Sequence, residues 1–391
     1  MPELRASVSL RAEETDSTSR SPCTYRGPVD VDVAVVGGGI AGVSVAGELS
    51  RESGLRIALL ERESQLGYHA SGRSAAAFLE SYGSPEIRAL TRASRPALDA
   101  GSLLARRPLV WLAPPDQVGK LRPLLAAEPA LREATEAEVR SLCPAVRPGW
   151  SVLNAVEDAA QDLDVAGLLE LYRRLAVTNG VTIHTGASIV DGQQKGSGWL
   201  LQTAVGEIRA TTIVNAAGAW ADDVARRCGL PEVGLTPYRR TLAIVTAAAV
   251  DRAWPLVADI GETFYFRPEG DGLLLSPADE TPSDPVDARA ETEDVARALE
   301  RANEATTLNL RHVRTTWAGL RTFAPDRNPV VGAAAEGFIW IAGQGGYGMQ
   351  TAPAMATLAA SMVLGRPVPD ELTREGFDPA PLSPARFVTT A

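Results

Sequence analysis

The first element that the apolar pattern predicts is a short buried strand. Residues 31–36 form a mostly apolar, β-branched run of the kind that lies inside a parallel sheet. After a glycine-rich turn, apolar residues recur on one helical face from Ile40 to Leu49, and a second apolar strand is expected at 56–61. This order predicts that the folded chain begins with a βαβ unit.

The remaining pattern continues as alternating strands and helices. Asp164 is placed to cap an amphipathic helix that Gly180 ends, and a last helix with one apolar face ends at Gly365. A charged helix is expected over about 291–305. Further strands are expected at 109–112, 181–184, 199–204, 210–215, 241–246, 263–267 and 338–341.

These elements predict an α/β fold with two domains. One is a doubly wound, Rossmann-like nucleotide-binding domain, and the other is an antiparallel-sheet domain for the substrate, inserted into the first. The polar segment 1–28 is expected to be a disordered extension. We assign 29–84, 155–228 and 318–380 to the nucleotide-binding domain, and 85–154 and 229–317 to the substrate domain.

Composition narrows the class of protein further. The chain has 391 residues and a net charge of −10, without the basic cluster that nucleic acid binding requires. No run approaches the ~18 apolar residues of a membrane span, and the N-terminus lacks a secretory signal. Cys23, Cys143 and Cys228 lie far apart, which fits structural thiols in a reducing compartment. We therefore expect a cytoplasmic protein with no nucleic acid partner, no stable membrane insertion and no metal site.

The turn at residues 37–42 matches the G-x-G-x-x-G pattern of dinucleotide-binding sites. Gly37 permits the tight turn, Gly39 lets the backbone approach a pyrophosphate, and Gly42 lets helix and strand pack closely. Glu61 ends the next strand, where its carboxylate can accept hydrogen bonds from ribose hydroxyls. The motif argues against a 2′-phosphate but does not separate FAD from NAD.

Several longer blocks follow this motif in order and reach almost to the C-terminal helix. Together they resemble the D-amino acid oxidase superfamily of flavoenzymes, and their spacing is similar to that of bacterial D-arginine dehydrogenases. The blocks are Glu61-Arg62-Glu63, GYHASGRSAA (67–76), VNAAGAW (214–220), TWAGLR (316–321), APDRNPVVG (324–332) and GQGGYGMQT (343–351).

The resemblance implies FAD as the cofactor. It is expected to be noncovalent, because no cysteine lies in 343–348, where some sarcosine-oxidising relatives attach their flavin. The turn at 343–348 would aim a helix N-terminus at the flavin, and Arg73 would bring a cation to it. The implied cofactor-binding residues are Gly37, Gly39, Ile40, Ala41, Gly42, Glu61, Arg62, Ser71, Gly72, Arg73, Ser74, Ala187, Ala217, Gly218, Trp220, Arg321, Gly345, Gly346, Tyr347, Gly348, Met349 and Gln350.

The resemblance also implies a site for an amine that bears a carboxylate. Arg240 and Arg321 fall where the resembling enzymes hold that carboxylate, and Tyr265 where they hydrogen-bond it. Tyr82 falls near the site entrance, and the Gly346 carbonyl is expected to accept from the substrate amine. Each has a structural alternative: a solvated or salt-bridged arginine, or a tyrosine that only packs.

Two departures concern the distal end of the substrate. Arginine-oxidising relatives carry a histidine where this chain has Ala77, and a glutamate where it has Leu109. A buried leucine cannot pair with a guanidinium, so the site is expected to favour a non-basic substrate.

The resulting hypothesis is hydride transfer from the C–N bond of a D-amino acid to flavin, with oxygen or another electron acceptor reoxidising it. Three alternatives stay open. In the first, the substrate is a secondary amine such as an N-substituted glycine. In the second, the protein is a flavin-dependent hydroxylase that needs NAD(P)H. In the third, it is an NAD-binding protein without flavin or a catalytically inactive binding protein.

Overall fold

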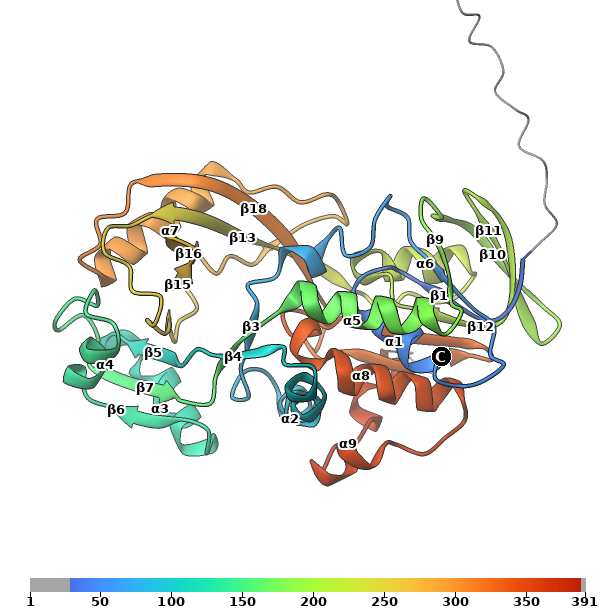
Figure 1. Ribbon diagram of the computed structural model, residues 1–391, viewed down its shortest axis with the longest axis horizontal. Coiled ribbons are helices and arrows are strands. Elements are labelled where there is room, and N and C mark those ends of the chain that lie inside the picture. Colours follow the sequence, from blue (N-terminus) through green and yellow to red (C-terminus); the bar gives the residue numbers. More distant parts are fainter. Residues whose placement is uncertain (1–28, 388–391) are drawn as a thin grey trace, which may run out of the picture.

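Two large β-sheets, lying side by side along the long axis of the molecule, organise the fold (Figure 1). The computed structural model describes residues 29–387, so the predicted disorder of 1–28 falls outside the described residues. The glycine-rich turn follows the first strand of one sheet, in one half of the molecule, and the second sheet forms most of the other half. A small three-stranded sheet consists of β3 (Ala77–Phe78), β8 (Gln161–Leu163) and β4 (Leu104–Arg106).

The first sheet has a parallel centre around the first strand. β1 pairs in parallel with β2 and β12, β9 continues beyond β2, and β20 pairs in parallel with β12. Antiparallel strands extend this centre on the side of β12 and β20. The bounds are β1 (Val29–Val36), β2 (Ile57–Leu60), β9 (Thr182–His184), β10 (Ile189–Lys195), β11 (Gly198–Thr203), β12 (Gly206–Asn215), β19 (Val330–Ala335) and β20 (Phe338–Ala342).

Helices cover both faces of this sheet, which is why β1 is apolar on both sides. Val33 and Val35 belong to the core cluster under α1 (Ile40–Leu49), α5 (Val165–Thr178) and α8 (Gly348–Val363). Ala34 and Val36 belong to the cluster under α6 (Ala221–Arg227). Successive strand residues point to opposite faces, so an uninterrupted apolar run serves both cores. The predicted doubly wound domain is confirmed.

The second sheet is mostly antiparallel, with one exception. β14 pairs in parallel with β5, and the other pairs in the sheet are antiparallel. The antiparallel-sheet domain is as expected apart from this pair. β5 and β14 lie far apart in sequence, so no hairpin fixes their relative direction. The bounds are β5 (Leu109–Ala113), β6 (Arg132–Ala134), β7 (Leu153–Glu157), β13 (Thr236–Thr246), β14 (Leu256–Asp259), β15 (Tyr265–Glu269), β16 (Gly272–Ser276), β17 (Thr281–Pro282) and β18 (His312–Phe323).

The local signals for helix ends agree with the structure. The Asp164 side chain caps α5 by accepting a hydrogen bond of 2.8 Å from Gly167 N, and Gly180 and Gly365 have positive φ where their helices end. The apolar pattern does not predict β10, because the sequence of that strand is mostly polar, as suits the edge of a sheet. The other helices are α2 (Pro85–Ala100), α3 (Val118–Ala127), α4 (Glu136–Leu142), α7 (Thr292–Ala305) and α9 (Asp370–Arg374).

Cys143 and Cys228 are buried, and burial raises the pKa of each thiol to about 12. Thiols of this kind stay protonated and unreactive, so their role is in packing. Cys23 lies outside the described residues. In the part of the chain that the structure covers, no helix has the length and apolar character needed to cross a membrane.

A buried carboxylate fixes the segment that carries Tyr82. Glu157, at the end of β7, is fully buried and accepts hydrogen bonds from Glu80 N (2.8 Å), Ser81 N (3.3 Å) and the Ser81 hydroxyl. From the other side, the Gln350 amide bonds both the N–H and the carbonyl of Leu79 at 3.2 Å. The segment is therefore tied to both halves of the molecule.

This carboxylate predicts a pH trend in stability. Burial raises the pKa of Glu157 above its usual 4.5, against the opposing effect of its hydrogen bonds. The folded state therefore binds the proton more tightly, and stability from this group is greatest at low pH and is lost as pH rises through the folded pKa. We expect the thermal midpoint of the wild type, relative to Glu157→Gln, to increase as pH falls from 7 towards 4.5. A difference that is flat, or that grows with pH, would contradict this assignment.

Candidate functional site

The glycine-rich turn leaves room for a ligand at one glycine only. A Cβ on Gly37 would lie 2.3 Å from Ala216 O, and one on Gly42 would lie 1.8 Å from Gly37 O. A Cβ on Gly39 would meet only the Ser71 hydroxyl, at 3.1 Å. Gly37 is thus required by packing against the residue that follows β12, and Gly42 by packing within the turn. Gly39 has only one side-chain hydroxyl near it, which fits the close approach of a pyrophosphate.

Glu61 lies beside this turn, at the end of β2. One carboxylate oxygen accepts from Gly38 N at 2.6 Å and the other from Glu63 N at 2.7 Å. Its side chain is nearly buried and lines the same cavity as Gly39. The backbone therefore fixes the orientation of the carboxylate that was predicted to meet a ribose.

A cavity of about 440 Å³ extends from this turn to the second sheet, a volume in the range of cofactor sites. Most residues of the predicted cofactor set line it. They are Gly37, Gly39, Ile40, Ala41, Glu61, Arg62, Ser71, Arg73, Ser74, Ala187, Ala217, Gly218, Trp220, Arg321, Gly345, Gly346, Gly348 and Met349.

Four residues of that set do not line this cavity. Gly42 and Gly72 are packing glycines, the latter because a Cβ would lie 2.5 Å from Gly67 O. The Tyr347 ring packs against Tyr82 with centroids 5.0 Å apart. The Gln350 amide is occupied by Leu79 and by the Thr91 hydroxyl, 2.8 Å away.

Two lining residues differ from expectation in what they bind. The Arg73 guanidinium donates to the carbonyls of Ala288 and Ala318, each at 2.9 Å, and pairs with Asp287. The Arg73 side chain therefore links the loop before α7 to β18, and its positive charge is already paired with Asp287. The Ser71 hydroxyl accepts from Ile40 N at 2.8 Å, so it caps the first turn of α1.

A second, smaller cavity of about 80 Å³ adjoins the first. Arg240, Tyr265, Arg321 and Gly346 line both cavities, whereas Tyr82 lines only the smaller one. Four of the five predicted substrate residues therefore meet at the junction, although they come from β13, β15, β18 and the turn before α8.

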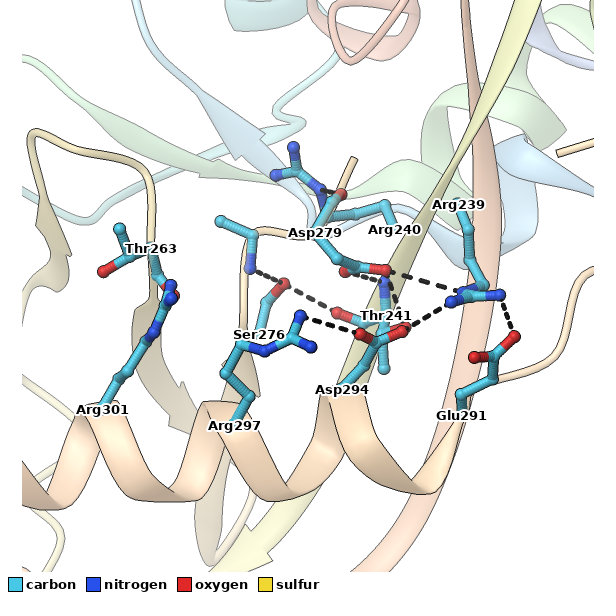
Figure 2. Close-up of polar contacts among 11 residues, drawn as sticks. Arg239, Arg240, Thr241, Thr263, Ser276, Asp279, Glu291, Asp294, Arg297 and Arg301 are labelled. Carbon is cyan, nitrogen blue, oxygen red and sulfur yellow. Dashed lines mark hydrogen bonds and ion pairs between the residues drawn. The ribbon is translucent and has the colours of Figure 1, made fainter. Parts of the chain in front are cut away.

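Arg240 is held rigidly at this junction by the backbone of a neighbouring loop. It is 3% exposed, and its Nε donates to the Asp279 carbonyl at 2.8 Å while Nη2 lies 3.3 Å from Glu280. The Asp279 carboxylate in turn accepts from Thr241 N (2.6 Å) and the Thr241 hydroxyl (3.0 Å) (Figure 2). Burial raises the pKa of Asp279, and the Thr241 hydrogen bonds oppose that shift.

The neighbouring Arg239 points away from the cavity. It pairs with Glu291 and Asp294 at the start of α7, while Arg240 lies on the other side of Asp279 (Figure 2). Consecutive strand residues face opposite sides of a sheet, so the two arginines have separate environments. Burial of Arg240 excludes the alternative of a solvated arginine pair.

Arg321 carries a charge that the surrounding protein does not neutralise. Its guanidinium packs against Gly346, where a Cβ would lie 2.8 Å from Cζ, and within the described residues it forms no ion pair. Burial lowers the pKa of Arg321, but Tyr82, Tyr265 and Glu262 outweigh burial and keep it above the ordinary value. The buried Tyr265 hydroxyl also lacks a partner among the described residues. A half-buried cation beside an unpaired hydroxyl suits a bound anion.

Sequence reasoning missed other residues that line the smaller cavity. Glu262 has a positive φ of 53° in the turn after β14, and its carboxylate accepts from the Tyr82 hydroxyl at 3.1 Å. Trp111 lies on the part of the second sheet that forms the floor of the smaller cavity. Leu109 and Ala77 line the same cavity, as expected. No local signal indicated Glu262 or Trp111, because the turn and the strand pairing bring them to the cavity.

The structure combines a doubly wound sheet and a cavity that is large enough for a dinucleotide. A second sheet brings Arg240 and Arg321 to that cavity. This combination defines a dinucleotide-dependent oxidoreductase. The chain belongs to the DAO family, the FAD dependent oxidoreductases, which it matches over residues 32–362. It is an enzyme with FAD as its cofactor, and the open face at Gly39 and the oriented Glu61 fit that group.

The chain is similar to several enzymes of this family. The chain is 28% identical to a glycine oxidase of Pseudomonas aeruginosa, over 90% of this chain and 98% of that protein. The glycine oxidase structure from Geobacillus kaustophilus has a TM-score of 0.79 at 23% identity, covering 92% of this chain and all of that chain. Iminodiacetate oxidase from Chelativorans sp. BNC1 has a TM-score of 0.74 at 19% identity, covering 90% and 98%. Family membership is confirmed. The expected kinship with D-arginine dehydrogenases is not supported, because the relatives that align along nearly the full length of both chains include glycine oxidases of Pseudomonas aeruginosa and Geobacillus kaustophilus.

The turn geometry predicts how flavin content depends on the glycines. Gly39→Val should fold but block the approach to the pyrophosphate, whereas Gly42→Ala should disturb the turn itself because it displaces the Gly37 carbonyl. Gly119→Val is the control, because a Cβ there meets nothing within 4 Å. The measurement is flavin per protein in the supernatant after acid precipitation. Full flavin in Gly39→Val would refute the role of Gly39, and flavin retained in the pellet would refute noncovalent binding.

Proposed function

We propose that this enzyme oxidises the C–N bond of a small amine that carries a carboxylate. The observation behind the proposal concerns Arg321, which lies at the junction of the cofactor-sized cavity and the smaller one. Its positive charge forms no ion pair with a carboxylate of the described residues. A substrate carboxylate supplies the missing counterion and fixes the amine at that junction.

In this proposal the two arginines have different tasks. Arg321 binds the carboxylate directly, and Arg240 offers its remaining N–H groups from a position that the Asp279 carbonyl fixes. The Tyr265 hydroxyl donates to the same carboxylate, and the Gly346 carbonyl accepts from the amine. Tyr82, next to Glu262, stands beside the substrate in the smaller cavity. Bound FAD supplies the hydride acceptor, and the other residues of the predicted cofactor set that line the large cavity hold it.

Two classes of substrate fit the carboxylate clamp. One is a D-amino acid with a non-basic side chain; the other is glycine or an N-substituted glycine. The relatives named glycine oxidase and iminodiacetate oxidase favour the second class. The small volume of the second cavity, about 80 Å³, favours short substituents in either class.

The function is tested by anaerobic bleaching of the flavin without NAD(P)H. Glycine, sarcosine, iminodiacetate and the D- and L-forms of alanine and leucine are compared, and at least one amine is expected to reduce the flavin. Bleaching that occurs only with NAD(P)H would make the enzyme a hydroxylase and overturn the proposal.

The clamp predicts the effect of removing either arginine. Arg321→Ala and Arg240→Ala should each raise the KM or slow flavin reduction, because a charge-assisted hydrogen bond contributes about 1.5–3 kcal/mol, or roughly 10-fold to more than 100-fold. Flavin content should not change. Arg366→Ala, which loses only an exposed pair with Glu52, serves as the control. Normal turnover in both clamp variants would show that the carboxylate is bound elsewhere.

The wall of the smaller cavity predicts discrimination against basic side chains. Ala77 and Leu109 line it, and neither can pair with a guanidinium. D-Arginine and D-lysine should therefore reduce the flavin more slowly than D-leucine, D-methionine or sarcosine. Leu109→Glu should raise the rate at which D-arginine reduces the flavin. Leu109→Gln, whose side chain has the size of glutamate but no charge, is the control and should not raise that rate. A tenfold preference of the wild type for D-arginine would contradict this expectation and assign the anion to Glu262.

A further inference from the structure

Three residues form a row across the floor of the smaller cavity. Trp111 on β5 pairs in register with Ala258 on β14, and Ala258 pairs with Tyr265 on β15. Residues paired across neighbouring strands project from the same face of a sheet, and adjacent strands lie about 4.8 Å apart. The Trp111 and Tyr265 backbones are therefore roughly 10 Å apart, and only the methyl group of Ala258 stands between the two aromatic side chains.

The surroundings of this row are apolar. Leu109 and Leu256 lie two residues before Trp111 and Ala258, so they share the same face, and both are buried. Ala77 and Leu79 line the cavity beside them. The carboxylates in the lining, Asp259 and Glu262, come from the end of β14 and the turn after it. A charged substituent therefore has no partner along the floor itself.

Both aromatic residues carry a buried donor without a partner. The Trp111 indole N–H and the Tyr265 hydroxyl are shielded from solvent and make no hydrogen bond with the described residues. The indole N–H of Trp340 is also unpaired, but that side chain lines neither cavity. Buried polar groups are normally satisfied, and Trp111 and Tyr265, unlike Trp340, line the smaller cavity, so a ligand in that cavity is the candidate partner for their donors.

We infer that the Trp111–Ala258–Tyr265 row binds the substituent of the substrate, and that this substituent is neutral and carries a hydrogen-bond acceptor such as an ether or carbonyl oxygen. The inference rests on the proposed function, because the clamp at Arg321 holds the carboxylate end. Tyr265 lies next to that clamp, which leaves the Trp111 N–H for the substituent. An indole N–H only donates, so an ammonium or guanidinium group cannot bind to it.

Isosteric substrate pairs test this acceptor. O-Methyl-D-serine is compared with D-norvaline, and N-(2-methoxyethyl)glycine with N-butylglycine, so that each pair exchanges one methylene for an ether oxygen. In at least one pair the ether should show a larger ratio of flavin reduction rate to apparent Kd, by about 3- to 10-fold. The pair that responds identifies whether the substituent is attached to Cα or to nitrogen. Ratios near one in both pairs overturn the inference, without requiring any variant.

Variants then locate the effect. Trp111→Phe keeps an aromatic ring but removes the N–H, so the ether preference should vanish, whereas Trp340→Phe removes an unpaired indole outside the cavity and should preserve it. Ala258→Val narrows the gap between the aromatic rings and should slow the longer substrates more than sarcosine. An ether preference that persists in Trp111→Phe also overturns the inference. If no amine bleaches the flavin, the proposed function fails; if amines bleach it but the ether preference is absent, only the acceptor site fails.

Discussion

The Arg321 guanidinium is a half-buried positive charge that the protein leaves without a counterion among the described residues, and the architecture around it depends on this. Removing an unpaired charge from water is unfavourable, so such a site persists where a ligand completes it. β18 brings the arginine to the junction of the two cavities, and Gly346 has no side chain to obstruct the guanidinium. Tyr82 and Tyr265 support the charged form by outweighing the effect of burial on the pKa of Arg321.

Arg240 shows the opposite arrangement, in which the protein already uses part of the hydrogen-bonding capacity. Its Nε is bound by the Asp279 carbonyl, and that loop is held by Thr241. Arg239 pairs with the acidic start of α7 and balances the buried Asp279 from the other side. Among the described residues, one arginine is thus fixed by a neighbouring loop and the other forms no ion pair, an arrangement that suits the carboxylate of the proposed substrate.

The smaller cavity differs in chemistry between its junction with the larger cavity and its floor. Its junction with the larger cavity carries Arg240 and Arg321, whereas the floor residues Trp111 and Tyr265 contribute one unpaired indole N–H and one unpaired hydroxyl. Glu262 lies beside Tyr82, so negative charge is present but belongs to the turn after β14. Family membership alone does not decide between substrates, since the fold is shared with enzymes named for different amines, whereas the floor is built from residues that the family motifs do not include.

The sequence by itself determined the nucleotide half of the protein. The buried strand, the glycine turn and the acidic end of β2 follow one another in the chain, so the pattern that identifies them lies within residues 29–61. The blocks shared with the flavoenzyme family likewise indicated FAD and the arginines. Only the tertiary structure committed Arg73 to Asp287, brought Glu262 to Tyr82, and aligned Trp111, Ala258 and Tyr265. The first two contacts join turns and loops that are distant in the sequence. Strand register decided the third, because the parallel pairing of β5 with β14 is specified by packing and not by any local turn.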